Sequence, residues 1–166
     1  MAIPKKILKY LEDKKYKFSV IEHKTTFTAW DTAQTEKINP KAIAKALVLR
    51  IDRDYVLALV PGNRNLDKPR LLKVINAKRK KEKLKTCKKL DFAKEIWMKK
   101  NLPGKVGAVP PFADLLKLEI FADNLLLKNK KIYIGSGEYT FSLLMNTSEY
   151  IKKENIIKGS FSKTKK

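Results

Sequence analysis

Two runs of apolar and β-branched residues, separated by only three charged positions, most constrain how this chain can fold. The runs occupy residues 44–51 and 55–60, and Asp52-Arg53-Asp54 lies between them. Runs of this length that are bounded by turn-forming residues are typical of paired strands. Pro61, Gly62 and Asn63 follow the second run and end it. We therefore expect a β-hairpin over residues 44–60.

The rest of the chain predicts helices and strands without a regular alternation. Helical spacing and capping signals favour helices over residues 4–14, 28–37, 66–75 and 91–100 and a short one capped by Thr147. Strand patterns occupy residues 18–21, 118–122, 131–134 and 139–144. This order predicts a single α+β domain with a mixed, curled sheet, because regular βαβ units are missing.

Length and composition narrow the class of protein further. The chain has 166 residues, the size of one domain, which we place at residues 1–158, with a basic, disordered tail at 159–166. Cys87 is the single cysteine and His23 the single histidine, so a disulfide and a structural zinc site are both excluded. The longest apolar run has six residues, against roughly eighteen for a membrane span. We expect a soluble protein of a reducing cytoplasm without a membrane partner.

Almost all of the net charge of +21 lies in three segments. Residues 68–100 carry +11, residues 152–166 carry +5 and residues 1–24 carry +4, whereas everything else sums to +1. Such a surplus implies an anionic partner such as a nucleic acid. Lysine supplies 33 of the 38 basic residues, which favours loose phosphate tracking over the reading of bases.

The densest basic cluster is the candidate phosphate-binding surface. Its members are Lys78, Arg79, Lys80, Lys81, Lys83 and Lys85, with Lys88 and Lys89 nearby. The alternative is a lysine-rich surface that reflects genome composition or solubility alone.

Few residue patterns offer catalytic chemistry. The chain has no Gly-x-Ser-x-Gly elbow, no phosphate-binding P-loop and no Gly-x-Gly-x-x-Gly, which disfavours a hydrolytic triad and nucleotide binding. Lys45 stands out because it begins the apolar run Ala46 to Leu49, where partial burial would favour an ordered role. The alternative is a lysine that snorkels at the end of a sheet. Most of the glycines fall at junctions between elements, where backbone can approach a ligand closely, although a simple turn explains each of them equally well.

Six short motifs occur in a recognisable order. They are Glu22-His23 with Thr28 and Ala33, Lys45-Ala-Leu-Val-Leu, Leu59-Val-Pro-Gly-Asn-Arg64 with Leu66-Asp67, Gly107-Ala-Val-Pro-Pro-Phe112, Asp123, and Gly135-Ser-Gly137. In this order they resemble the YbaK and prolyl-tRNA synthetase-associated editing domain family. The resemblance spans residues 3–151.

This resemblance implies a fold, a reaction and a set of site residues. The sheet would form a partial barrel flanked by helices, and the protein would act in trans to hydrolyse the ester of mischarged tRNA, with proline tRNA carrying Cys or Ala as the expected substrate. Lys45 matches the family's essential lysine. The candidate substrate-binding residues are Phe27, Thr28, Gly107, Ala108, Phe112, Gly135, Ser136 and Gly137.

The resemblance also implies how the reaction proceeds. The substrate's own ribose hydroxyl would orient the water, Lys45 would hold the terminal phosphate or the substrate, and backbone amides near Gly107 and Gly135 would stabilise the oxyanion. No metal or cofactor is implied. The implied partners are tRNA and prolyl-tRNA synthetase, and the expected state is a monomer.

Some residues depart from the family pattern. Pro110 precedes Pro111, Ala113 follows Phe112, and Glu138-Tyr139 stands where several subgroups have histidine or arginine. A non-catalytic module that binds tRNA, ribosome or synthetase therefore stays as the alternative, followed by a hydrolase for another acyl ester or thioester. We expect His23 to be structural and to hydrogen-bond the loop that carries Phe27. The lysines around Cys87 could lower the pKa of its thiol.

Overall fold

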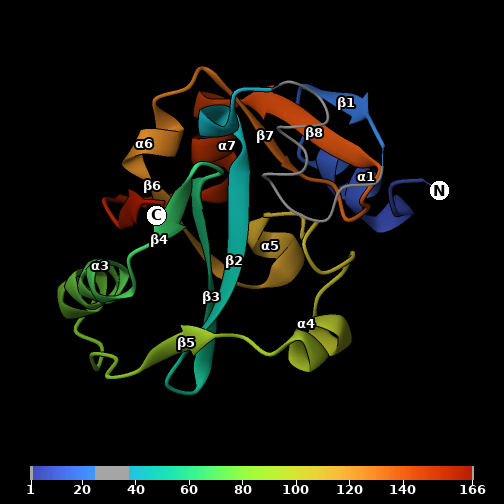
Figure 1. Cartoon of the computed structure of the whole chain (residues 1–166). Coiled ribbons are helices and arrows are strands. Elements are labelled where there is room, and N and C mark those ends of the chain that lie inside the picture. Colours follow the sequence, from blue (N-terminus) through green and yellow to red (C-terminus); the bar gives the residue numbers. More distant parts are fainter. Residues whose placement is uncertain (1, 25–37, 166) are drawn as a thin grey trace.

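Helices pack on both faces of a mixed sheet in the computed structural model, which describes residues 2–24 and 38–165 (Figure 1). The helices are α1 (Lys5–Asp13), η1 (Pro40–Ala42), α3 (Lys68–Lys81), α4 (Glu95–Asn101), α5 (Ala113–Leu116), α6 (Asn124–Leu127) and α7 (Thr147–Glu154). The strands are β1 (Phe18–Glu22), β2 (Ala44–Ile51), β3 (Asp54–Pro61), β4 (Arg64–Leu66), β5 (Leu90–Phe92), β6 (Glu119–Asp123), β7 (Lys131–Gly135), β8 (Phe141–Asn146), β9 (Ile157–Gly159) and β10 (Ser162–Thr164).

The predicted hairpin forms the centre of the largest sheet. Strands β2 and β3 pair antiparallel from Ala44 opposite Pro61 to Ile51 opposite Asp54. The five strands run in the order β5-β2-β3-β6-β9, with β6 parallel to both of its neighbours. Strands β1, β8 and β7 form a second sheet, and β4 pairs with β10. The α+β class and the mixed, curled sheet are confirmed.

Two hydrophobic cores lie on opposite faces of the central hairpin. Successive residues of a strand point to opposite faces. Accordingly, Ala44 and Val48 belong to the core that includes residues of α1, α5, α6 and α7. Leu49 and Ile51 belong to the core beneath α3, where Leu71 is fully buried. The central sheet therefore separates two environments, and a side chain's position along β2 decides which one it enters.

Several predicted boundaries need correction. Residues 91–100 are not one helix, because Leu90–Phe92 forms β5 against β2 and α4 begins only at Glu95. Helix α3 begins after the predicted cap Asp67 but continues to Lys81. The last helix is capped by the side chain of Asn146 instead of Thr147. The helix expected over residues 28–37 lies outside the described residues.

The C-terminal segment is ordered through residue 164, contrary to the expected disordered tail. Strand β10 pairs antiparallel with β4, and Phe161 is fully buried in the core beneath α3. The carboxylate of Asp123 accepts hydrogen bonds from the backbone N–H groups of Phe161, at 2.8 Å, and Ser162, at 2.9 Å. The buried carboxylate of Asp123, at the end of β6, therefore holds the backbone of Phe161 and Ser162, although the composition of residues 159–166 predicts disorder.

Candidate active site

Lys45 lies near the start of β2 with its ammonium group held by β4. Its Nζ donates to the carbonyl oxygen of Arg64 at 2.6 Å and to Oδ1 of Asn65 at 3.3 Å. The side chain is half-buried, and burial together with the charge of Lys165 lowers its pKa. Two acceptors within the protein thus orient a partly desolvated cation, as the ordered role expected for Lys45 requires.

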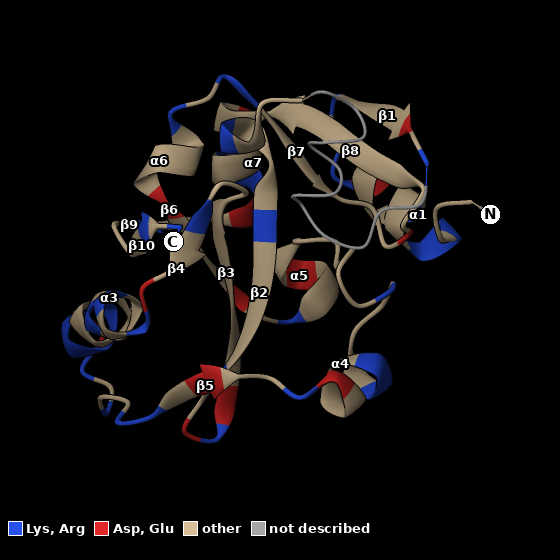
Figure 2. Ribbon diagram, viewed as in Figure 1, with Lys and Arg blue, Asp and Glu red and all other residues tan. Residues whose placement is uncertain are grey.

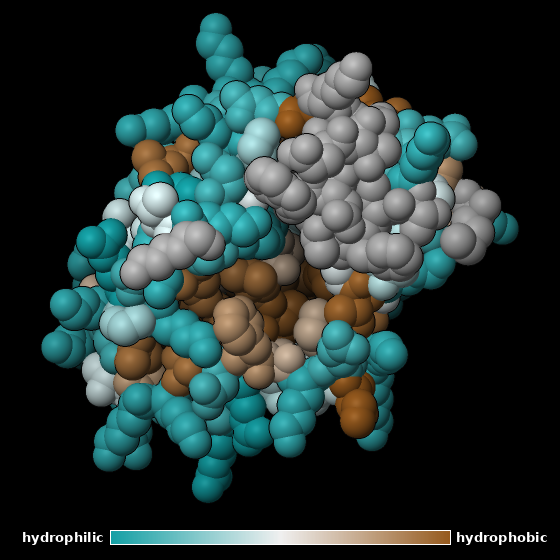
Figure 3. All heavy atoms as spheres, in the orientation of Figure 1, coloured by the Kyte–Doolittle hydropathy of each residue, from teal (hydrophilic) through white to brown (hydrophobic). Residues whose placement is uncertain are grey.

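A cleft of about 460 Å³ opens in front of Lys45. It lies on the α3 face of β2 and is lined by Lys45, Leu47, Asn65, Leu66, Lys68, Pro69, Phe92 and Lys163. Figure 3 shows the same side of the molecule hollowed, with apolar side chains at the base of the hollow and hydrophilic ones around its rim. The cleft combines an apolar floor with several cations, which suits a ligand that carries both apolar and anionic groups.

The two predicted glycine loops lie against each other. Gly137 N–H donates to the Ala108 carbonyl at 2.7 Å, and Lys105 N–H donates to the Gly137 carbonyl at 2.9 Å. A Cβ added at Gly135 would lie 2.4 Å from the Val109 carbonyl oxygen, so only glycine permits this close approach. The structure therefore brings Gly107, Ala108, Gly135 and Gly137 together in one neighbourhood.

The register of β2 and β7 relates these loops to Lys45. An isolated parallel bridge joins Ile43 to Tyr133. Lys45 lies two residues beyond this bridge on one strand, and Gly135 lies two residues beyond it on the other. Lys45 and Gly135 therefore each lie two residues after the bridged pair, whereas the lining of the Lys45 cleft includes no residue of the glycine loops.

Phe112 is a core residue in this structure. It is fully buried, and its ring contacts those of Tyr10, Tyr16 and Tyr150 at centroid distances of 5.1, 5.7 and 6.3 Å. It belongs to the core on the face of the sheet opposite Lys45. The structure thus does not place Phe112 in the cleft with Lys45.

Ser136 also turns inward. Its hydroxyl is fully buried and donates toward two backbone carbonyls, that of Phe141 at 2.7 Å and that of Glu138 at 3.1 Å. Both interactions lie within the turn that connects β7 to β8. These hydrogen bonds stabilise the turn through a side chain that points into the protein. At this position the loop can therefore present backbone groups to a ligand, and not the Ser136 hydroxyl.

A partly buried ion pair connects the two glycine loops, and no pattern in the sequence points to it. Lys105 Nζ lies 2.7 Å from Oε1 of Glu138, a residue that is 6% exposed. The hydrogen bond from Lys105 is the main cause that lowers the pKa of Glu138. Tyr139 adds a hydrogen bond from its hydroxyl to the Val106 carbonyl. Glu138-Tyr139, noted above as a departure from the family pattern, therefore links the loops.

His23 is hydrogen-bonded through both ring nitrogens, whereas the loop that carries Phe27, its predicted partner, lies outside the described residues. Its Nε2 lies 2.9 Å from the Ser142 hydroxyl on β8, and its Nδ1 lies 2.7 Å from the Lys24 carbonyl. Both ring nitrogens are therefore engaged within the protein. The pocket-wall candidates Phe27 and Thr28 lie outside the described residues.

The basic cluster divides into paired and exposed residues. Lys78 contacts Glu119 at 2.7 Å and also Glu82, and these two carboxylates raise its pKa. Arg79 reaches Asp54 at 3.4 Å and the Lys85 carbonyl at 3.2 Å. The cluster occupies the last turn of α3 and the loop after it, and its exposed members are Lys80, Lys81, Lys83 and Lys85 (Figure 2).

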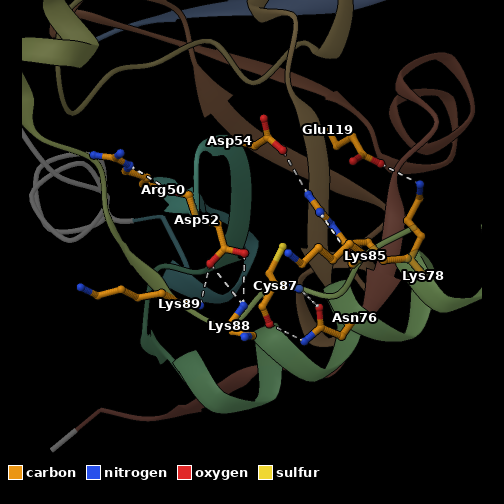
Figure 4. A network of polar contacts seen from close by, with 11 residues as sticks. Arg50, Asp52, Asp54, Asn76, Lys78, Lys85, Cys87, Lys88, Lys89 and Glu119 are labelled. Carbon is orange, nitrogen blue, oxygen red and sulfur yellow. Dashed lines mark hydrogen bonds and ion pairs between the residues drawn. The ribbon is translucent and has the colours of Figure 1, made fainter. Parts of the chain in front are cut away.

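Cys87 differs from the expectation of an activated thiol. The residue is buried, and burial raises the pKa of its thiol despite the opposing charge of Arg79. Its backbone N–H and C=O are both bound by the side chain of Asn76, at 2.7 and 3.0 Å (Figure 4). The neighbouring turn is fixed by Asp52, whose carboxylate accepts from the N–H groups of Lys88 and Lys89. Cys87 is thus a packed thiol whose pKa is raised by burial.

A family model for the aminoacyl-tRNA editing domain matches residues 23–153. The match covers most of the chain and includes Lys45 and both glycine loops. The chain belongs to the aminoacyl-tRNA editing domain family. A comparison with proteins of curated function finds no match.

Solved structures share the fold of this chain. A proposed trans-editing enzyme for prolyl tRNA synthetase superposes with a TM-score of 0.80 at 19% identity, over 96% of each chain. The hypothetical protein APE2540 superposes with a TM-score of 0.79, also at 19% identity, over 95% of this chain and 99% of its own. At this identity the likeness establishes a shared fold.

Metal-binding clusters and membrane-spanning helices do not occur in the part of the editing domain that the structure describes. Within residues 2–24 and 38–165, no three His, Cys, Asp or Glu side chains lie close enough together to hold a metal ion. Across the same residues, no helix is both long enough and apolar enough to cross a membrane.

Proposed function

We propose that this editing domain hydrolyses the ester bond of mischarged tRNA in trans, with proline tRNA carrying Cys or Ala as the substrate. The observation that carries the proposal is the half-buried ammonium group of Lys45, oriented by β4 in a cleft of the editing-domain fold. Association with prolyl-tRNA synthetase would supply the choice of tRNA. An ester is already an activated bond, so positioning and charge stabilisation suffice for its hydrolysis.

The hydrogen bonds of Lys45 support a binding role over a role as base. An ammonium group has three donors, and Arg64 and Asn65 accept two of them. Both acceptors favour the charged form of the lysine. The third donor is available for an anionic oxygen of the substrate, which fits the terminal phosphate of a tRNA.

Backbone donors in the glycine loops support charge stabilisation at the carbonyl. The Ala108 N–H donates to the Lys105 carbonyl of its own loop, and the Gly137 N–H donates to the Ala108 carbonyl of the neighbouring loop. Among the described residues, the Gly107 N–H donates to no other group, and Gly107 adopts a φ of +91° that favours glycine. We assign the Gly107 N–H as the donor toward the developing oxyanion. The water that attacks would be oriented by the substrate's own ribose hydroxyl.

The test compares deacylation by the wild type, Lys45→Ala, Lys45→Arg and the control Lys152→Ala, on proline tRNA charged with Cys or Ala. Lys152 is an exposed lysine on α7 that does not line the cleft, so its loss removes one charge outside the site. Lys45→Ala is expected to lose about 10²-fold or more in deacylation rate, because the substrate is no longer positioned. Thermal unfolding should stay close to that of the wild type.

Two outcomes would contradict the proposal. Full turnover by a folded Lys45→Ala protein would remove Lys45 from the site. Absence of hydrolysis by the wild type on every charged tRNA, with tRNA binding intact, would favour the non-catalytic binding module.

A further inference from the structure

The C-terminal strand β10 completes one wall of the Lys45 cleft, and this carries an inference beyond the reaction itself. Lys163 on β10 lies directly opposite Asn65 on β4. Directly opposite residues of an antiparallel pair share a face and have Cβ atoms about 5 Å apart. Asn65 is the residue whose side chain accepts a hydrogen bond from Lys45 Nζ. Lys163 is thus held beside the predicted catalytic lysine.

The opposite wall carries an exposed aromatic ring with a cation over it. Phe92 on the edge strand β5 is 51% exposed, an unusual exposure for a large apolar side chain. Lys68 at the start of α3 places its Nζ 4.5 Å from the centroid of this ring. Phe92, Lys68 and Lys163 all line the same cleft as Lys45. Aromatic rings and cations in one groove are the elements with which proteins bind unpaired nucleotides.

The fold positions β10 firmly, as a binding wall requires. Arg64 donates from Nε to the Ser162 hydroxyl at 2.7 Å and from Nη2 to the Ser162 carbonyl at 3.1 Å. Asp123 binds the N–H groups of Phe161 and Ser162, and the ring of Phe161 is buried. Three hydrogen bonds to backbone groups of Phe161 and Ser162, and a fourth to the Ser162 hydroxyl, therefore hold the strand while Lys163 stays exposed.

The charge around the cleft indicates what it binds. Among the described residues, the lining set contains three lysines and no acidic side chain. Lys165, which follows β10, adds a positive field strong enough to act on Lys45. Lys163 itself forms no ion pair or hydrogen bond with its side chain in the described part of the chain. An uncompensated positive groove beside an exposed ring is complementary to a single-stranded polynucleotide.

We propose that the cleft between β10 and β5 binds the unpaired 3′ nucleotides of tRNA, with a base stacked on Phe92 and backbone phosphates on Lys68 and Lys163. This inference rests on the proposed function, because it assigns the path by which the acceptor end reaches Lys45. It also separates two kinds of tRNA contact. The basic cluster on α3 contacts the duplex body, and the cleft contacts the single strand.

The test uses uncharged tRNA, so that it does not depend on catalysis. Affinity is measured for tRNA with its 3′ CCA end and for the same tRNA lacking these three nucleotides. The wild type should prefer the complete tRNA. Phe92→Ala should weaken binding of complete tRNA about fivefold or more, the usual effect of losing one stacked base, and leave trimmed tRNA unaffected. Phe92→Tyr retains a ring and should retain the preference.

The lysine is tested by its salt dependence. Lys163→Gln should reduce the log-log salt slope for complete tRNA by about 0.7 for each single-strand phosphate that the lysine neutralises, without changing the slope for trimmed tRNA. The control Lys152→Gln removes an equal charge from α7 and should change neither slope. Thermal unfolding of each variant verifies that the fold is intact.

The results separate this inference from the proposed function. Equal affinity of the wild type for complete and trimmed tRNA would overturn the inference. An equal effect of Lys163→Gln on both tRNAs would do the same, because the lysine would then contact the duplex. Deacylation by the wild type in either case would leave the proposed function standing. A preference for the complete tRNA without any deacylation would support the cleft and contradict the enzyme.

Discussion

The Lys45 cleft and the basic cluster on α3 use positive charge in opposite ways. Lys45 is a single half-buried cation with two fixed acceptors. The cluster contributes four exposed lysines at a helix end and in the loop after it, and its two remaining members are already ion-paired. A fixed, partly desolvated charge can position one atom of a ligand, whereas mobile exposed charges raise the local concentration of phosphates. The two regions therefore suit different tasks, and the number of charges alone does not distinguish those tasks.

The two regions also differ in what anchors them. The cleft depends on β10, which the buried carboxylate of Asp123 holds from 38 residues earlier in the chain. The loop after α3 is tied down at the surface by Asp52, Asp54 and Arg79 (Figure 4). Buried hydrogen bonds to charged groups contribute more stability than exposed ion pairs. We expect the cleft to respond to the loss of its anchor far more strongly than the cluster does.

Among the changes that test this difference between the cleft and the basic cluster, Asp123→Ala is expected to have the largest effect. The change leaves the buried N–H groups of Phe161 and Ser162 without an acceptor. It also removes the side-chain acceptor of the Leu125 N–H at the start of α6. The free energy of unfolding should fall by about 3 kcal/mol, since each unsatisfied buried group costs roughly 1–3 kcal/mol. Urea unfolding measures this change. Hydrogen exchange should accelerate at residues 161–164.

Asp114→Ala is the matched control for this experiment. Asp114 forms an exposed ion pair with Lys14, so its loss should change the free energy of unfolding by less than about 1 kcal/mol. Equal stability losses in the two variants would contradict the idea that Asp123 is the anchor of the C-terminal strand.

A smaller effect is expected when the cluster is neutralised. The triple change of Lys80, Lys81 and Lys83 to Gln should weaken binding of complete and trimmed tRNA alike. The log-log salt slope should fall by about 0.9 for each duplex phosphate that these lysines neutralise. Filter binding between low and moderate salt measures both slopes. A slope that the triple variant leaves unchanged would remove the cluster from the tRNA-binding surface.

Local sequence patterns predicted the structural features that depend on residues close together in the chain. The hairpin of β2 and β3 follows from two apolar runs and a charged turn, and the start of α3 follows from Asp67, whose side chain accepts from the Arg70 N–H. Helix α3 extends beyond its predicted end because its last turn is rich in lysine, and the apolar pattern contains no stop signal there. The family resemblance pointed to both glycine loops, which the structure brings together.

Contacts between distant segments account for most of what the sequence could not predict. Phe161 gains its order from Asp123 and from the core beneath α3. The thiol of Cys87 lies among lysines in the sequence, yet packing buries it and raises its pKa. Phe112 follows the loop that carries the family motif, yet three tyrosine rings from α1, its following loop and α7 enclose it. Burial of this kind depends on tertiary neighbours, which no local pattern records.

A change of pH is expected to have the smallest effect on tRNA binding. It distinguishes the cleft from the basic cluster through the protonation state of Lys45. Burial lowers the pKa of Lys45, so its ammonium group loses its proton at a lower pH than an ordinary lysine does. Below that lowered pKa the cation holds its phosphate, and as pH rises through it the contact weakens. The preference for complete over trimmed tRNA should therefore decline in the wild type as pH rises from neutrality toward the ordinary pKa of lysine, about 10.4. Lys45→Arg keeps its charge throughout this range and should show a flat profile, because arginine does not deprotonate in proteins.

The triple cluster variant retains Lys45, so it should show the wild-type decline at a lower overall affinity. A decline that persists in Lys45→Arg would assign the titration to another group and would remove the distinction between a fixed cation and a mobile one.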